Sequence, residues 1–108
     1  MTQVSDHSIT SGNYTLAAKL FTPNGQPKAA YVLHCATGVP AAYYTKFADW
    51  VASQGHAILT YDYRQDADVK NSKIRLSDWG IADQSAALDT LIDLYPDTEI
   101  RVIGHSLG

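Results

Sequence analysis

Cysteine, net positive charge and long apolar runs are all scarce in this 108-residue sequence, and each scarcity excludes a class of protein. A single cysteine, Cys35, can form no disulfide within the chain, which is typical of a reducing compartment. The formal net charge of −3 provides no basic field to attract nucleic acid or an anionic membrane surface. No apolar run approaches the roughly 18 residues of a membrane span, and no basic start with an apolar segment marks a secretory signal. We therefore expect a cytoplasmic protein that binds neither nucleic acid nor membrane.

The first part of the chain predicts an antiparallel hairpin. Residues 4–10 and 14–22 are extended segments, and Ser11-Gly12-Asn13 between them suits a tight turn. Every second residue from Tyr14 to Leu20 is apolar, which gives the second strand one apolar face. The turn-forming residues 22–28 end the hairpin.

After residue 28, short apolar runs alternate with helical patterns. Residues 29–33 and 57–61 predict two strands buried on both faces. Between them, Pro40 opens a helix and Gly55 ends it. A longer helix is capped by Ser77 or Asp78 and closed by Pro96. The expected apolar faces are Tyr43, Phe47, Trp50 and Val51 in the first helix, and Ile81, Leu88, Leu91, Ile92 and Tyr95 in the second.

This alternation predicts parallel strands joined by right-handed crossovers, with helices on both faces of the sheet. Ligands of such sheets bind at the carboxyl ends of the strands. Three segments of the chain fall at that edge, namely residues 34–38, 62–64 and 104–108.

The last nine residues carry the clearest chemical motif. Residues 100–103 predict a buried strand, and Gly104-His105-Ser106-Leu107-Gly108 fits the pattern G-x-S-x-G. In this motif a strand turns sharply into a helix, and glycines on both sides give the room that the bend needs. The serine oxygen then projects above the sheet, and the N–H of Leu107 can point at a developing oxyanion. We predict Ser106 as a nucleophile.

Three passages together resemble the amino-terminal half of the α/β-hydrolase fold superfamily, and in particular an esterase-like and serine-aminopeptidase-like group of bacterial hydrolases. They are His34-Cys35-Ala36-Thr37-Gly38-Val39-Pro40 with residues 43–48, then Tyr61-Asp62-Tyr63-Arg64, then the motif around Ser106, with Asp78-Trp79-Gly80 opening the long helix. The resemblance covers nearly the whole chain. It implies an α/β fold in which an antiparallel hairpin precedes parallel strands with helices on both faces. Residues 1–108 would form a partial domain that stops at the nucleophile elbow.

The resemblance also implies a reaction, namely hydrolysis of a small-molecule ester or amide through an acyl-enzyme on Ser106, without cofactor or metal. Leu107 would donate one oxyanion N–H and the turn after residue 34 the other, with Ala36 as first choice and Cys35 as the next. His34 and Cys35 would contribute to binding. Many relatives have His-Gly where this chain has His34-Cys35, so the turn must accept a β-carbon. The family's acid and histidine base lie after the elbow, so we expect the 108-residue chain alone to be an inactive fragment.

Other interpretations of these residues remain open. His34 is the histidine best placed to substitute as a base, although a role in shaping the oxyanion turn by hydrogen bonding is favoured. Cys35 can act as a thiolate nucleophile, but a small, partly buried residue is the preferred interpretation. Asp62, Asp66 and Asp68 lack the glycine and glutamate of a calcium loop and predict a solvated loop. Trp50, Trp79 and the tyrosines at helical spacing are expected in the core rather than in a substrate wall.

A second class of function competes with hydrolysis. The chain can be a non-catalytic half-domain that pairs with a second chain, as an interaction or complementation module. The last predicted strand, residues 100–103, has no partner on one side, and exposed apolar strands recruit other strands. We therefore expect the isolated chain to self-associate through this strand.

Overall fold

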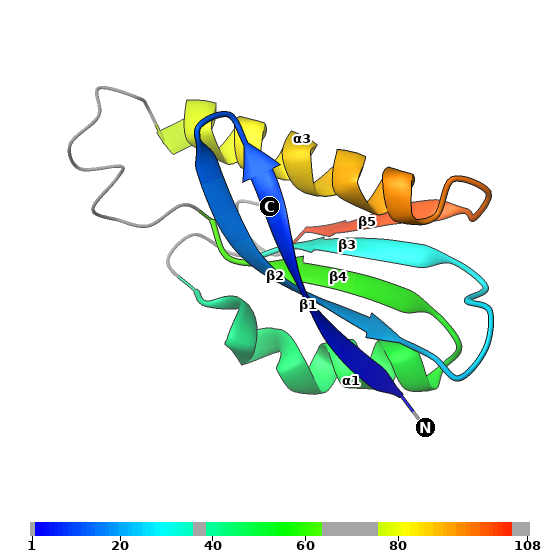
Figure 1. Cartoon of the computed structure of the whole chain (residues 1–108). Coiled ribbons are helices and arrows are strands. Elements are labelled where there is room, and N and C mark those ends of the chain that lie inside the picture. The colour runs from blue at the N-terminus through cyan, green and yellow to red at the C-terminus, as the bar shows by residue number, and fades with distance from the viewer. Residues whose placement is uncertain (1, 36–38, 64–75, 105–108) are drawn as a thin grey trace.

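The computed structural model of the chain describes residues 2–35, 39–63 and 76–104 (Figure 1). Within these ranges, five strands form one sheet in the order β1-β2-β4-β3-β5. The elements along the chain are β1 (Gln3–Ser11), β2 (Tyr14–Thr22), β3 (Ala30–His34), the 3-10 helix η1 (Ala41–Tyr44), α1 (Thr45–Ser53), β4 (Ala57–Tyr61), α3 (Leu76–Leu94) and β5 (Ile100–Gly104).

The predicted hairpin is confirmed. Strands β1 and β2 pair antiparallel, with Ile9 opposite Leu16, and each end of β1 extends one residue beyond the predicted strand. Gly12 in the turn has a φ of 60°, a conformation that glycine adopts without the steric cost of a β-carbon. Strand β2 also pairs antiparallel with β4, where Leu20 lies opposite Leu59, so the hairpin joins the rest of the sheet through β2.

The remaining strands are parallel, as the alternation of strands and helices predicts. Strand β3 lies between β4 and β5, and its Val32 is in register with Leu59 on one side and Val102 on the other. Strand β4 has the predicted bounds and all five of its residues are buried. Strand β3 begins and ends one residue later than predicted, which places His34 inside the strand.

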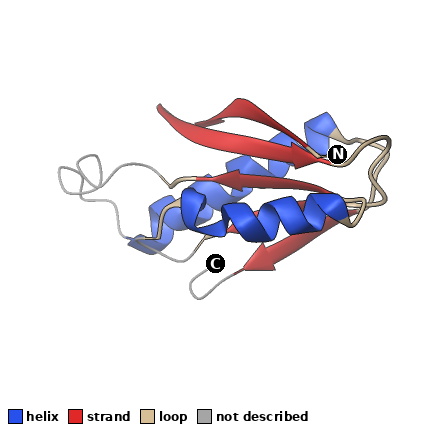
Figure 2. Cartoon of the chain, turned by 90° about the horizontal axis from the view of Figure 1, so that it is seen from below, coloured by secondary structure: helices blue, strands red, loops and turns tan. Residues whose placement is uncertain are grey.

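The two helices cover opposite faces of the sheet (Figures 1 and 2). On one face, Ala87 and Leu91 of α3 pack with Ile9, Leu16 and Leu59. The other face has a second core, which contains Phe21, Leu33, Tyr44, Ala48, Val51, Ala52 and Ile58. Helices on both faces therefore confirm the layered arrangement that the sequence predicts. No helix within the described residues is long and apolar enough to cross a membrane.

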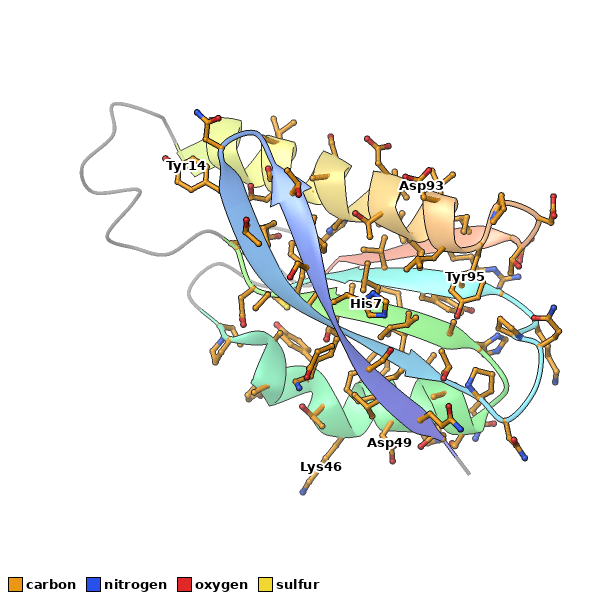
Figure 3. All side chains as sticks on the ribbon, viewed as in Figure 1. His7, Tyr14, Lys46, Asp49, Asp93 and Tyr95 are labelled. Carbon is orange, nitrogen blue, oxygen red and sulfur yellow. The ribbon has the colours of Figure 1, made fainter. Side chains whose placement is uncertain are left out.

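The predicted apolar face of α1 is wrong except for Val51. Tyr43, Phe47 and Trp50 are exposed, and the exposed fraction of Trp50 is 59%. The side facing the sheet is instead formed by Tyr44, Ala48, Val51 and Ala52. Ala48 and Ala52 are small and allow α1 to approach the sheet closely, and the Tyr44 ring packs against the same core from η1. Lys46 and Asp49 are also exposed, and Asp49 Oδ1 accepts a hydrogen bond of 2.7 Å from Thr2 Oγ1 (Figure 3).

Helix α3 and strand β5 need similar corrections. Ile81 and Ile92 are exposed rather than part of the core, whereas Leu88, Leu91 and Tyr95 pack against it as predicted. The helix begins at Leu76, so Ser77 and Asp78 lie inside it rather than capping it. The error is small, because capping preferences locate a helix end only to within a residue or two. Strand β5 forms where predicted, but it is not buried, since it lies at the edge of the sheet. The side chain of Trp79 falls outside the described residues.

The corrected face of α1 gives a direct test. Ala48→Phe should lower the free energy of unfolding by about 1 to 3 kcal/mol, because Ala48 has no exposed surface and the new ring must displace the sheet. Trp50→Ala should change it by less than about 0.5 kcal/mol, as is usual for exposed positions. Urea denaturation of both variants measures the difference. A larger loss of stability in Trp50→Ala than in Ala48→Phe would show that the aromatic side of the helix, and not the alanine side, packs against the sheet.

Candidate functional site

The carboxyl ends of β3, β4 and β5 lie together at one edge of the sheet, as the sequence predicts. His34, the last residue of β3, is in register with Gly104, the last residue of β5. Gly104 is the first glycine of the G-x-S-x-G motif. Ser106, Leu107 and Ala36 themselves lie outside the described residues, so their predicted roles stay predictions.

His34 is a buried histidine with a defined partner. Its Nδ1 lies 2.6 Å from the hydroxyl oxygen of Tyr61, and the two rings meet edge to face at 82°. Burial lowers the pKa of the imidazole below its usual 6.5, so the ring is mostly neutral at pH 7. This geometry is consistent with the predicted hydrogen-bonding role of His34 at the start of the turn.

Tyr61 is the centre of a hydrogen-bond network that the sequence analysis did not identify. The side chain is fully buried. Burial raises the pKa of its phenol, and a hydrogen bond with Tyr63 raises it further, so the hydroxyl keeps its proton. Gln84 Nε2 of α3 donates to the Tyr63 hydroxyl at 3.1 Å. The network therefore connects the end of β3, through the end of β4, to α3.

Cys35 is a protonated, buried thiol. Only 1% of its surface is exposed, and its Sγ–H donates to the carbonyl oxygen of Tyr61 at 3.5 Å. Burial, together with the negative charge of Asp62, raises the pKa of the thiol from 9.0 to about 11. A thiolate is the nucleophilic form of cysteine, so the alternative in which Cys35 attacks a substrate loses its support at neutral pH. The preferred interpretation of a small residue in the interior fits these contacts.

Asp62, the residue after β4, has a structural partner rather than the solvated position expected for it. Its Oδ1 accepts a hydrogen bond of 2.7 Å from the backbone N–H of Ala41, the first residue of η1. A carboxylate that accepts a backbone N–H forms a charge-assisted bond, which is stronger than a neutral one. Asp66 and Asp68, the other members of the acidic group, lie outside the described residues.

The signal that could have identified Tyr61 and Asp62 is their place in the chain. Both residues stand at the carboxyl end of a fully buried strand, where polar side chains need partners. The sequence could not name those partners, because Tyr61 lies 27 residues from His34 and Asp62 lies 21 residues from Ala41.

The buried thiol predicts a loss of stability in alkaline solution. Between pH 9 and 11 the unfolded chain releases the Cys35 proton while the folded chain keeps it, so folding becomes less favourable as the pH rises. By pH 11 the loss from this group should reach about 2 kcal/mol. Urea denaturation of the wild type and of Cys35→Ala at several pH values separates the contribution of the Cys35 thiol from that of the tyrosines, which both proteins share. Parallel pH profiles for the two proteins would show that the thiol titrates normally.

Comparisons with known proteins agree with this architecture. No protein-family model matches the sequence. The chain is 23% identical to the monoglyceride lipase of Mus musculus over 104 residues, which are 94% of this chain and 34% of the lipase. Its structure is similar to that of a carboxyl esterase from Bacillus coagulans, with a TM-score of 0.75 and 18% identity over 99% of this chain and 37% of the esterase.

Two further structures are similar at the same level. A dienelactone hydrolase from Anabaena variabilis has a TM-score of 0.79 and 17% identity over 99% of this chain and 53% of its own. An α/β serine hydrolase homologue from Coxiella burnetii has a TM-score of 0.72 and 17% identity over 94% of this chain and 51% of its own. The chain thus spans a third to a half of the length of these proteins. These similarities confirm the fold expected from the sequence: the chain has the fold of an α/β hydrolase.

Proposed function

We propose that the whole protein is a serine hydrolase, that it cleaves a small-molecule ester or amide, and that Ser106 is its nucleophile. One observation carries the proposal: Gly104, which opens the G-x-S-x-G motif, is in register with His34, which precedes the turn expected to supply an oxyanion N–H. The first residue of the motif and the residue before the turn thereby share the edge at which sheets of this kind bind ligands. The similar proteins include a lipase and esterases, which favours an ester substrate.

In this mechanism the Ser106 oxygen attacks the carbonyl carbon while a histidine base takes the hydroxyl proton. The carbonyl oxygen becomes negative and is bound by the N–H of Leu107 and the N–H of Ala36, with Cys35 as the next option. The alcohol or amine then leaves with that proton, and water hydrolyses the acyl-enzyme. His34 shapes the turn in this proposal, because its Nδ1 is already bound to Tyr61 and the ring is buried.

The acid and the histidine base are proposed to come from outside these 108 residues. The chain covers 34% of the lipase and 37% of the carboxyl esterase, so most of the length of each relative has no counterpart in it. A serine hydroxyl is a weak nucleophile at neutral pH without such a base. We also propose a cytoplasmic location, in keeping with the free, buried thiol of Cys35.

A fluorophosphonate probe tests the proposal, because it reacts readily only with an activated serine. We expect the whole protein to form a covalent adduct on the peptide that contains Ser106, identified by mass spectrometry. The Ser106→Ala variant and the 108-residue chain alone should not be labelled. Absence of labelling in the whole protein, or an adduct on a different residue, would contradict the proposal.

The edge strand supports the second candidate, a pairing module. Within the described residues β5 pairs with β3 alone, and Val102 is 54% exposed. We propose that the isolated 108-residue chain self-associates through β5, since an unpaired strand edge offers free N–H and C=O groups to another strand.

Sedimentation velocity at several concentrations measures this association. Val102→Lys should shift the isolated chain toward monomer, because a charge on an edge strand opposes pairing. Val4→Lys is the matched control, since Val4 is 52% exposed on β1 at the opposite edge of the sheet. A monomeric wild-type chain, or an equal effect of the two lysines, would contradict a role for β5.

A further inference from the structure

Two adjacent residues at the end of β4 bind both ends of the turn that joins β3 to η1 (residues 35–40). At the first end, the Tyr61 hydroxyl oxygen lies 2.6 Å from His34 Nδ1, and the Tyr61 carbonyl accepts from Cys35 Sγ at 3.5 Å. At the other end, Asp62 Oδ1 accepts from the N–H of Ala41 at 2.7 Å. One short segment therefore holds both described ends of the turn.

These bonds begin where the backbone pairing between β3 and β4 stops. The register of β3 with β4 ends at Val32 and Leu59, two residues before His34 and Tyr61. From that point the hydrogen bonds of Tyr61 continue the connection between the two strands. His34, Cys35 and Tyr61 are all buried, so water does not compete for these bonds.

The anchor itself is rigid. Strand β4 lies between β2 and β3 in the sheet and is buried along its whole length. The Tyr61 ring also packs edge to face against the ring of Tyr63, with the centroids 5.4 Å apart, and Gln84 of α3 donates to the Tyr63 hydroxyl. A group bound to this segment therefore keeps its place relative to the sheet, and Gly104 belongs to the same sheet.

We propose that Tyr61 and Asp62 are positioning residues: they hold the two ends of the β3–η1 turn, from which one backbone N–H of the proposed oxyanion hole comes. The catalytic part of this inference rests on the proposed serine hydrolase function. The structural part, that Tyr61 and Asp62 fix the turn, stands on the three hydrogen bonds alone. Binding at both ends matters because a displacement of about 1 Å in a reacting group can cost a hundredfold in rate.

The structural part is tested without any assay of activity. Hydrogen exchange of the Ala41 amide, followed by NMR in the whole protein, should accelerate about tenfold or more in Asp62→Ala, because the amide loses its acceptor. Asp62→Asn retains an oxygen at this position and should exchange at close to the wild-type rate. Unchanged exchange of the Leu59 amide shows that the variants remain folded. An Ala41 amide that exchanges equally in the wild type and in Asp62→Ala would overturn the inference.

The catalytic part is tested by kinetics with an ester. Tyr61→Phe and Asp62→Ala should each lower kcat about tenfold or more with little change in KM, because a displaced N–H stabilises the transition state less. Tyr31→Phe is the control, since it removes a tyrosine hydroxyl that binds Arg101 away from the turn. The 15N signals of the His34 ring should shift in Tyr61→Phe and stay in place in Tyr31→Phe.

The two proposals fail in different ways. If the wild-type whole protein does not hydrolyse esters or amides, the proposed function is wrong, and the Ala41 exchange still decides whether Asp62 holds the turn. If the wild type is active and both variants keep its kcat, the positioning role is wrong and the hydrolase function stands.

Discussion

Replacing Ser106 with alanine in the whole protein should lower kcat for an ester such as p-nitrophenyl acetate by about a thousandfold or more. Without the hydroxyl, no acyl-enzyme forms, and the reaction depends on direct attack by water on an oriented substrate. Oxyanion donors would still act on that slow reaction, so hydrolysis should remain somewhat above the rate in buffer. KM should change little, because the serine oxygen contributes mainly to the transition state.

Two matched variants make this result specific. Ser53→Ala removes an exposed serine hydroxyl on α1 that binds the carbonyl of Trp50, and it should leave kcat unchanged. Cys35→Ala removes the thiol of the first residue of the turn and distinguishes the two nucleophiles that the sequence allows. Loss of activity in Cys35→Ala together with full activity in Ser106→Ala would assign the chemistry to the thiol. The 108-residue chain, assayed in parallel, should be inactive in every form.

Most of the architecture could be predicted from the sequence because local patterns dictate it. The apolar residues at every second position from Tyr14 to Leu20 belong to a strand with one buried face, and the structure has that strand with the predicted bounds. Residues 57–61 are apolar enough to be buried on both faces, and β4 is buried throughout. The alternation of strands and helices then predicts parallel pairing, which β3 forms with both of its neighbours.

The side of a helix that faces the sheet was harder to predict. Two stripes run along α1 at helical spacing, one with large aromatic rings and one with alanines, and Val51 fits both. Ring size favours the aromatic stripe, yet the sheet accepts the alanines because they permit close packing. For β5 the sequence predicts the missing partner on one side but also predicts a buried strand, and the second prediction is wrong because the edge position leaves its side chains exposed.

The sequence predicts where the candidate site lies in the sheet but not which of its residues are hydrogen-bonded to one another. Parallel strands place His34, Asp62 and Gly104 at one edge, and this follows from the order of elements alone. The hydrogen bonds of Tyr61 and Asp62 depend on how two strands and a loop align in space, which no local pattern encodes. Ser106, Leu107 and Ala36 remain predictions, and the labelling and kinetic experiments above decide them.

Leu59→Ala should produce the largest loss of stability, about 2 to 5 kcal/mol in the free energy of unfolding. Leu59 lies in the middle of β4 with no exposed surface, between Leu20 of β2 and Val32 of β3. Its removal takes away apolar contacts and leaves a cavity that the surrounding strands cannot close. Since small domains unfold at a cost of about 5 to 15 kcal/mol, this single change would remove a large part of the total.

Ile81→Ala is the matched control for this prediction, because it removes a similar number of carbon atoms from a side chain that is 63% exposed on α3. It should change the stability by less than about 0.5 kcal/mol. Urea denaturation of both variants in the 108-residue chain gives the comparison. Sedimentation identifies a concentration at which the chain is monomeric, so that the transition reports unfolding alone. If Leu59→Ala cost no more than Ile81→Ala, β4 would not be the packed centre of the sheet. The anchor proposed for Tyr61 and Asp62 would then lose its rigid support, because both residues depend on this strand for their position.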